Sequence, residues 1–197
     1  MSNKLIRYFD VEMRASDEQE NRVSGIAAVF NSVADMGWFT EEIDPHAFDE
    51  CDMSDVILNF NHNNDYVLAG TRNGSLTLQV RDNGLYQESR IVDTMQGRDV
   101  MKLVREGLIC KQSFAFVIDK DNEGEYWTER DGKEHRIIRK ISNLFDVSLV
   151  VFPAYNSTSL YARSNSDDLA EEHRKLMLRR AEQDKRMERL FNGKDFK

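Results

Sequence analysis

Short runs of apolar and β-branched residues, each followed by a turn signal, recur through residues 4–163 and most strongly constrain the fold. The clearest of these runs cover residues 56–62, 109–118 and 144–152. Runs of this length, bounded by Gly, Pro, Asn or Asp, are typical of strands rather than helices. The sequence therefore predicts a β-rich α+β domain over residues 1–163.

Two helices are expected to interrupt the strands. Thr94 is a good N-cap for a helix over residues 96–106, and Gly107 is well placed to end that helix. Asp44 followed by Pro45 is a second helix-start signal, because Asp is a favoured N-cap and Pro is favoured at the first helical position.

The last part of the chain, residues 164–197, differs in composition from the rest. Fourteen of the twenty-four residues between 167 and 190 are Asp, Glu, Lys or Arg, and the apolar residues among them form only a thin stripe. We expect a charged linker and a solvated helical tail here.

Net charge and cysteine content exclude several classes of protein. The formal net charge is −8 at pH 7, whereas a nucleic-acid-binding protein needs a basic surface to neutralise phosphates. Cys51 and Cys110 lack the spacing of metal ligands, so reduced thiols are expected. Residues 1–7 lack the apolar stretch of a signal peptide, and no run has the length of a membrane span. We therefore expect an intracellular, soluble protein with no nucleic-acid or membrane partner.

Three polar residues interrupt the strand-like runs, namely His62, Ser113 and Asp146. A hydroxyl, an imidazole and a carboxylate are the three groups that a serine hydrolase uses. Each of the three also has a simpler structural explanation, which must be weighed beside the catalytic one.

Ser113 occupies the middle of a buried strand. Alternate residues of a strand share a face, so Ser113 lies with Lys111 and Ala115, and the other face carries Phe114 and Phe116. The small residues leave room for another group to approach. A small residue packed under a neighbouring strand is the simpler explanation for a lone serine.

His62 has the same strand parity as Leu58 and Phe60, so we expect it to continue a core-directed row at the end of its strand. The simpler explanation for this residue alone is a half-buried histidine whose ring nitrogens are hydrogen-bonded.

Asp146 is the anomaly of the third strand, because Asp is disfavoured in strands and a buried carboxylate needs a partner. A histidine is a suitable partner. The simpler explanation is a solvent-facing carboxylate at the start of the strand, paired with Arg139 or Lys140.

The sequence gives less support for a metal or cofactor site than for a serine hydrolase site. His62 and Asp65 could join His46 or His135 at a metal, but no helical or turn spacing supports such a set. The sequence has no glycine-rich phosphate loop. We therefore expect neither a metal nor a cofactor.

Ordered blocks of residues give a more specific indication. The blocks cover residues 25–30, 43–48, 56–71, 82–88, 97–107, 112–116 and 146–154. In this order they resemble the successive blocks of the tailed-phage prohead proteases, which are the serine peptidases of capsid maturation. The resemblance extends over about residues 5–163. It departs from the family pattern where Lys111 and Ala115 replace Gly, where Asp146 replaces Glu, and where His46 replaces Gly.

The resemblance implies a fold and a chemistry. The fold is a closed or nearly closed β-barrel flanked by a few helices, related to the herpesvirus assemblins. Ser113 is the implied nucleophile, His62 the base and Asp146 the third member, although the assemblins use a second His in that place. The order His, Ser, Asp differs from the order in trypsin-like, subtilisin-like and α/β-hydrolase enzymes.

The resemblance also implies partners. Such a protease cuts the major capsid protein's scaffold segment and itself, inside the procapsid in the host-cell cytoplasm, and the charged tail is a candidate for self-cleavage. A homo-oligomer is left open. Two alternatives remain: a catalytically inactive β-barrel protein of capsid assembly or scaffolding, and an unrelated small hydrolase or esterase.

Overall fold

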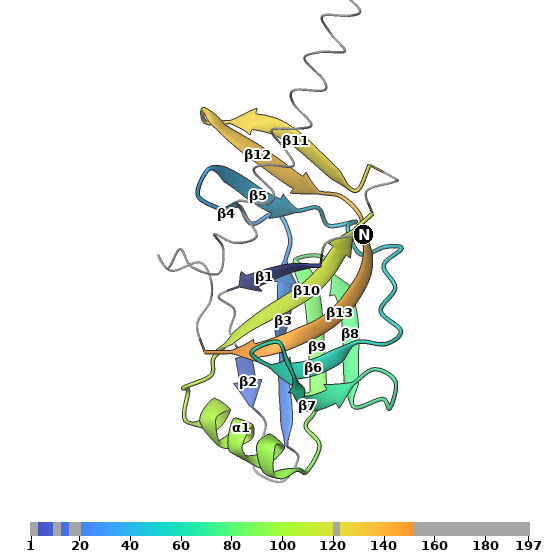
Figure 1. Ribbon diagram of the computed structural model, residues 1–197, viewed down its shortest axis with the longest axis vertical. Helices are drawn as coiled ribbons and strands as arrows, with labels where there is room; N and C mark the ends of the chain where they lie inside the picture. The colour runs from blue at the N-terminus through green and yellow to red at the C-terminus, as the bar shows by residue number, and fades with distance from the viewer. Residues whose placement is uncertain (1–3, 10–12, 16–20, 120–122, 152–197) are drawn as a thin grey trace, which may run out of the picture. The chain divides into compact units, whose positions relative to one another are not determined.

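The computed structural model describes residues 4–9, 13–15, 21–119 and 123–151 (Figure 1), all of them within the unit Met1–Ser157. The predicted boundary at residue 163 and the predicted tail over residues 164–197 lie outside these ranges. The described residues form thirteen strands and one helix. In chain order these are β1 (Leu5–Phe9), β2 (Met13–Ala15), β3 (Arg22–Val29), β4 (Ala34–Asp35), β5 (Phe39–Ile43), β6 (Ile57–Phe60), β7 (Asn63–Gly70), β8 (Leu76–Arg81), β9 (Gly84–Arg90), α1 (Met95–Arg105), β10 (Lys111–Ile118), β11 (Glu125–Arg130), β12 (Lys133–Ile138) and β13 (Ile141–Val150).

The strands form three sheets. The five-stranded sheet has the order β1-β10-β13-β6-β7, and the two four-stranded sheets have the orders β11-β12-β5-β4 and β2-β3-β9-β8. In the five-stranded sheet β10 pairs antiparallel with β1 and β13, and β13 pairs parallel with β6 (Figure 1). This sheet carries the three polar residues singled out in the sequence.

A closed barrel, one form of the expected closed or nearly closed barrel, is wrong for the described residues, because none of their three sheets closes on itself. Closure requires the two outermost strands of a sheet to pair with each other. In the five-stranded sheet those strands are β1 and β7, which remain its two edges. The predicted β-rich class is confirmed.

The core packs against one face of β10. Phe114 and Phe116 are fully buried, and their rings stack with centroids 4.8 Å apart. Phe48 packs on Phe114 with a centroid distance of 6.1 Å. Burying side chains of this size stabilises a fold by roughly 1.5–3 kcal/mol each, so these phenylalanines fix β10 and leave its other face to Ser113 and Ala115.

The helix predicted over residues 96–106 is confirmed as α1. Thr94 accepts a hydrogen bond from the Gly97 amide at 3.0 Å, as an N-cap does, and Gly107 follows the helix with a φ of 72°. Val100 and Val104 on its inner side are buried. No helix of the described residues is long and apolar enough to cross a membrane.

The second predicted helix, starting near Pro45, is wrong. Residues 45–50 form successive turns, in which the Ala47 amide bonds to the Asp44 carbonyl at 3.0 Å. The Ala47 carbonyl, which in an α-helix would accept the Cys51 amide, instead accepts the Ile141 amide of β13 at 2.8 Å, and the Cys51 amide donates to the Phe48 carbonyl at 3.1 Å. The pairing with β13 therefore replaces the helix that the local signal favours, and the described part of the chain has one flanking helix instead of a few.

Candidate active site

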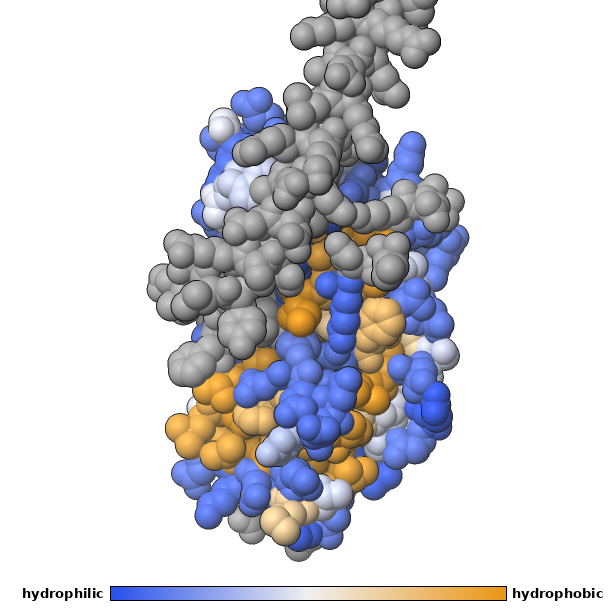
Figure 2. Space-filling view, in the orientation of Figure 1, coloured by the Kyte–Doolittle hydropathy of each residue, from blue (hydrophilic) through white to orange (hydrophobic). Residues whose placement is uncertain are grey.

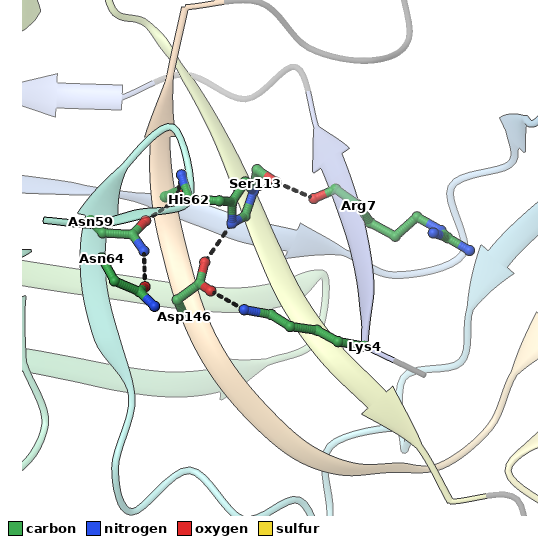
Figure 3. Close-up of polar contacts among 8 residues, drawn as sticks. Lys4, Arg7, Asn59, His62, Asn64, Ser113 and Asp146 are labelled. Carbon is green, nitrogen blue, oxygen red and sulfur yellow. Dashed lines mark hydrogen bonds and ion pairs between the residues drawn. The ribbon is translucent and has the colours of Figure 1, made fainter. Parts of the chain in front are cut away.

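The five-stranded sheet brings His62, Ser113 and Asp146 together (Figure 3). The His62 Nε2 atom lies 2.5 Å from the Ser113 Oγ atom, and the His62 Nδ1 atom lies 2.5 Å from the Asp146 Oδ1 atom. The imidazole therefore bridges a hydroxyl and a carboxylate, one on each ring nitrogen. The three residues come from the β6–β7 turn, from β10 and from β13.

Ser113 lies in the middle of β10, directly opposite Ser148 of β13. Its side chain shares a face with Ala115, as the alternation predicts, and the small Ala115 leaves space beside it. Ser113 has no exposed surface. The register of β10 thus fixes where the hydroxyl lies.

The predicted strand parity of His62 is wrong. β6 ends at Phe60, which pairs with Asn63 of β7, so Asn61 and His62 form a two-residue hairpin turn. Their φ angles are 52° and 56°, and a type I′ turn requires positive φ at both central residues. The turn takes His62 out of the row that buries Leu58 and directs its imidazole toward Ser113.

A β-bulge directs Asp146. Phe116 pairs with Leu144 and Ala115 pairs with Asp146, so Phe145 is an extra residue of β13 at this point. A bulge changes which face the following side chains take. Leu144 therefore lies on the core side with Phe116, and the next paired residue, Asp146, lies on the side of Ser113.

Asp146 is 1% exposed and has two basic neighbours. Its Oδ1 atom lies against His62, and its Oδ2 atom accepts a hydrogen bond from Lys4 Nζ at 2.9 Å. Pairing with Lys140, which the sequence left open, is not found, because Lys140 instead forms ion pairs with Glu50 and Asp119.

The charge of Asp146 is stabilised by these neighbours. Burial raises the pKa of the Asp146 carboxyl, but the hydrogen bonds and positive charge of His62 and Lys4 outweigh it and hold the pKa below its ordinary value. The carboxylate is therefore ionised at neutral pH and accepts the Nδ1 hydrogen of His62, which leaves Nε2 facing Ser113.

The Ser113 hydroxyl has a second neighbour, the backbone carbonyl of Arg7 in β1, at 2.8 Å. The hydroxyl carries one hydrogen and can donate it to one acceptor at a time. When His62 is neutral, the hydroxyl donates to Nε2. When His62 is protonated, Nε2 donates to Ser113 Oγ and the hydroxyl donates to Arg7. The site therefore accommodates both protonation states.

Several residues of the site were not predicted from the sequence. Ser148 accepts a hydrogen bond from the His62 amide at 2.9 Å and donates one to Asn59. Lys4 and Arg7 belong to the N-terminal strand region, and no local pattern connects them to β10. Ser148 alone had a usable signal, because it lies two residues after Asp146 and so shares its face.

Polar side chains surround the turn that carries His62. Asn61, Asn63, Asn64 and Asp65 are exposed, whereas the His62 side chain is only 9% exposed. Figure 2 shows hydrophilic residues over this part of the sheet, with hydrophobic residues beside them. No group of three or more His, Cys, Asp or Glu within the described ranges is placed to hold a metal ion.

Comparisons with known proteins identify the family. The family model of the caudovirus prohead serine protease matches residues 9–172. A search of curated proteins found no match. Among solved structures, the bacteriophage T4 capsid assembly protease, gp21, is similar with 12% sequence identity and a TM-score of 0.49, and the match covers 75% of this chain and 96% of that chain. The family match spans most of the sequence, and the chain therefore belongs to the caudovirus prohead serine protease family.

Proposed function

We propose that this protein is a serine endopeptidase of procapsid maturation, with Ser113 as nucleophile, His62 as general base and Asp146 as the residue that orients His62. The observation that carries the proposal is the continuous contact from Ser113 Oγ through both nitrogens of His62 to Asp146, each at 2.5 Å. A nucleophile, a base and a group that orients the base are what acyl transfer by serine requires.

In the proposed first step, Ser113 Oγ attacks a peptide carbonyl while its proton passes to His62 Nε2. Asp146 stabilises the imidazolium that forms. The imidazolium then gives the proton to the leaving amine, the C–N bond breaks, and an ester links the substrate to Ser113. A water molecule, deprotonated by His62, hydrolyses the ester and restores the hydroxyl. A positioned base of this kind contributes about 10²–10⁴-fold to the rate.

The family membership supports a capsid or scaffold protein as substrate. We propose the major capsid protein, its scaffold segment, and this chain itself as the substrates. The reaction would then take place inside the procapsid, in the host-cell cytoplasm.

A second candidate is an assembly or scaffold protein without catalytic activity. Two features favour it. Ser113 has no exposed surface, so a substrate reaches it only after a covering group moves. Lys111 and Ala115 stand where the resemblance to the family leads us to expect Gly. The arrangement of His62 between Ser113 and Asp146 favours the protease, because a nucleophile, a base and a group that orients the base are what nucleophilic catalysis requires.

Co-expression with the matching capsid protein separates the two candidates. The parent chain should shorten the capsid protein, and the Ser113→Ala and His62→Ala chains should assemble procapsids in which the capsid protein keeps its full length. Equal processing by the parent and by Ser113→Ala would reject the protease proposal. Intact masses of the capsid protein and of this chain provide the measurement.

A further inference from the structure

We infer that Ser148 is a positioning residue, whose buried hydroxyl holds the β6–β7 turn so that His62 reaches Ser113 and Asp146 together. This inference rests on the proposed function, since the orientation of His62 affects the rate only if His62 acts as a base. Ser148 is not one of the three reacting groups.

The turn that carries His62 is intrinsically unfavourable. Asn61 and His62 both have positive φ, at 52° and 56°. Residues other than Gly populate this region rarely, and Asn and His are among the few that tolerate it. A turn of this kind persists when neighbouring groups hold it in place, so its contacts determine where the imidazole lies.

The contacts that hold the turn come from β13 and from the residue that follows it, Val151. The Asn61 amide donates to the Leu149 carbonyl at 3.0 Å, and the Asn61 side-chain oxygen accepts the Val151 amide at 3.4 Å. The His62 amide donates to Ser148 Oγ at 2.9 Å. Of these contacts, the one with Ser148 acts on the backbone of His62 itself.

Ser148 lies at the centre of the site. It is fully buried, it pairs with Ser113 across the β10–β13 ladder, and it pairs with Asn59 across the β13–β6 ladder. It also follows Asp146 by two residues on the same face. One hydroxyl therefore contacts the turn of His62 beside the strands that carry Ser113 and Asp146.

The hydrogen bonds of Ser148 continue into the hairpin. Its hydroxyl donates to the Asn59 side-chain oxygen, and the Asn59 amide group donates to Asn64 at 3.5 Å. Asn59 is fully buried, so its oxygen depends on this donor. These contacts connect β13 to β6 and to the start of β7. β6 and β7 are the two strands that flank the turn.

Replacing Ser148 by alanine removes an acceptor and a donor at once. The His62 amide loses its partner, and so does the buried Asn59 oxygen. The turn is then free to shift toward other partners, and the imidazole shifts with it. A displacement of about 1 Å at a reacting group can lower a rate by about 10²-fold.

The experiment uses the full chain and compares Ser148→Ala and Ser148→Cys with the parent. Ser142→Ala is the matched control, because Ser142 also lies on β13 but its hydroxyl donates to the Val117 carbonyl at 3.3 Å. Three quantities are measured: the phosphonylation of Ser113 by a fluorophosphonate, in which Oγ displaces fluoride from phosphorus, the low-field proton resonance of the His62 Nδ1 hydrogen, and the midpoint of thermal unfolding.

We expect the maximal phosphonylation rate of Ser148→Ala to fall about 10- to 100-fold, with little change in the fluorophosphonate concentration that gives half the maximal rate. The Nδ1 resonance should broaden or disappear. Ser142→Ala should match the parent in both. Ser148→Cys should lie between the parent and Ser148→Ala, because sulfur fills the place of the hydroxyl but accepts hydrogen bonds weakly.

A folded Ser148→Ala chain with the parent's phosphonylation rate and the parent's Nδ1 resonance would overturn the inference and leave the proposed function intact. If the parent itself is not phosphonylated, either alone or co-assembled with its capsid protein, the proposed function fails, and the resonance alone decides whether Ser148 holds His62. If Ser148→Ala does not fold, Ser148→Cys provides the same comparison.

Discussion

Two buried polar networks lie on opposite faces of the strands β1 and β10, and they differ in the kind of group that they contain. One joins Lys4, Asp146, His62 and Ser113. In the other, the Glu41 carboxylate accepts hydrogen bonds from the guanidinium groups of Arg7 and Arg136, at 2.8 Å from Arg7 Nη2 and 3.2 Å from Arg136 Nη1.

The two networks differ in whether they contain a group that can transfer a proton to or from a substrate. Arginine stays protonated in proteins, so the Glu41 network has no group that passes a proton to a substrate. The His62 network combines a hydroxyl, an imidazole and a carboxylate in sequence. Burial and hydrogen bonding alone are therefore poor evidence of a catalytic site, and the identity of the groups decides the matter. Arg7 belongs to both networks, because its side chain contacts Glu41 and its carbonyl contacts Ser113.

The largest effect is expected within the His62 network. His62→Ala should lower the cleavage rate per folded molecule by about 10²–10⁴-fold, because the base is lost. Its thermal midpoint should also fall, because Ala at a φ of 56° is strained and buried Asp146 loses a partner. Cleavage of the co-expressed capsid protein and thermal unfolding of the purified chain measure the two quantities. A His62→Ala chain that cleaves at the parent's rate would remove the distinction between the networks.

Glu41→Gln should act on stability rather than on the rate per folded molecule. It removes the buried carboxylate that pairs with both Arg7 and Arg136, although Arg136 keeps its ion pair with Glu125. Breaking a buried pair by removing one partner costs about 3–5 kcal/mol. Urea unfolding gives the free energy, and cleavage per folded molecule gives the rate. The control is Glu88→Gln, whose partner Arg22 and own side chain are both exposed, so its stability should match the parent's. A slower rate per folded molecule in Glu41→Gln would indicate that Arg7 couples the networks.

Acidification should weaken both networks. Burial raises the pKa of the Glu41 carboxyl, but the charges and hydrogen bonds of Arg7 and Arg136 outweigh it, so its pKa is lowered, as is that of Asp146. A carboxyl with a lowered folded-state pKa stabilises the fold fully above its ordinary value, 4.5 for Glu41 and 3.8 for Asp146, and loses that contribution as the pH falls through the folded-state pKa.

The free energy of unfolding, measured from pH 6 downward, should therefore decrease below about pH 4.5. Glu41→Gln should show a shallower decrease than the parent, because one of the two carboxyls no longer titrates. Parallel curves for the two chains would contradict the assignment of Glu41.

The smallest effect is expected for Lys4→Met. The Lys4 side chain is 44% exposed, and an ion pair open to solvent contributes at most about 1 kcal/mol. The pKa of Asp146 should rise toward its ordinary value, which the carbon-13 shift of its carboxyl group reports, and cleavage should slow by less than about tenfold. Lys140→Met, which removes the partner of Glu50 instead, is the control. A loss of cleavage activity as large as in His62→Ala would contradict this prediction and would indicate that Lys4 takes part in catalysis.

The site could be predicted from the sequence only where local pattern decides the structure. The faces of β10 follow from alternation, and α1 follows from Thr94 and Gly107, so both were predictable. The face of β10 on which Ser113 lies follows from this alternation alone.

The rest depends on partners distant in the sequence. The Asn61–His62 turn departs from strand parity, the bulge at Phe145 directs Asp146, and the loss of the helix near Pro45 depends on Ile141 of β13. Barrel closure was expected from a resemblance and not from the pairing of edge strands. Strand pairing and bulges are set by tertiary contacts, which a local pattern does not contain.

The most direct test of the central claim is to react the chain with a fluorophosphonate, both alone and co-assembled with its capsid protein, and to locate the adduct by peptide mass. The account predicts one adduct, on Ser113, which forms in the parent and in Glu41→Gln but about 10²-fold or more slowly in His62→Ala. A parent chain without an adduct on Ser113 in either preparation, or an adduct on Ser113 that forms equally fast without His62, would contradict it.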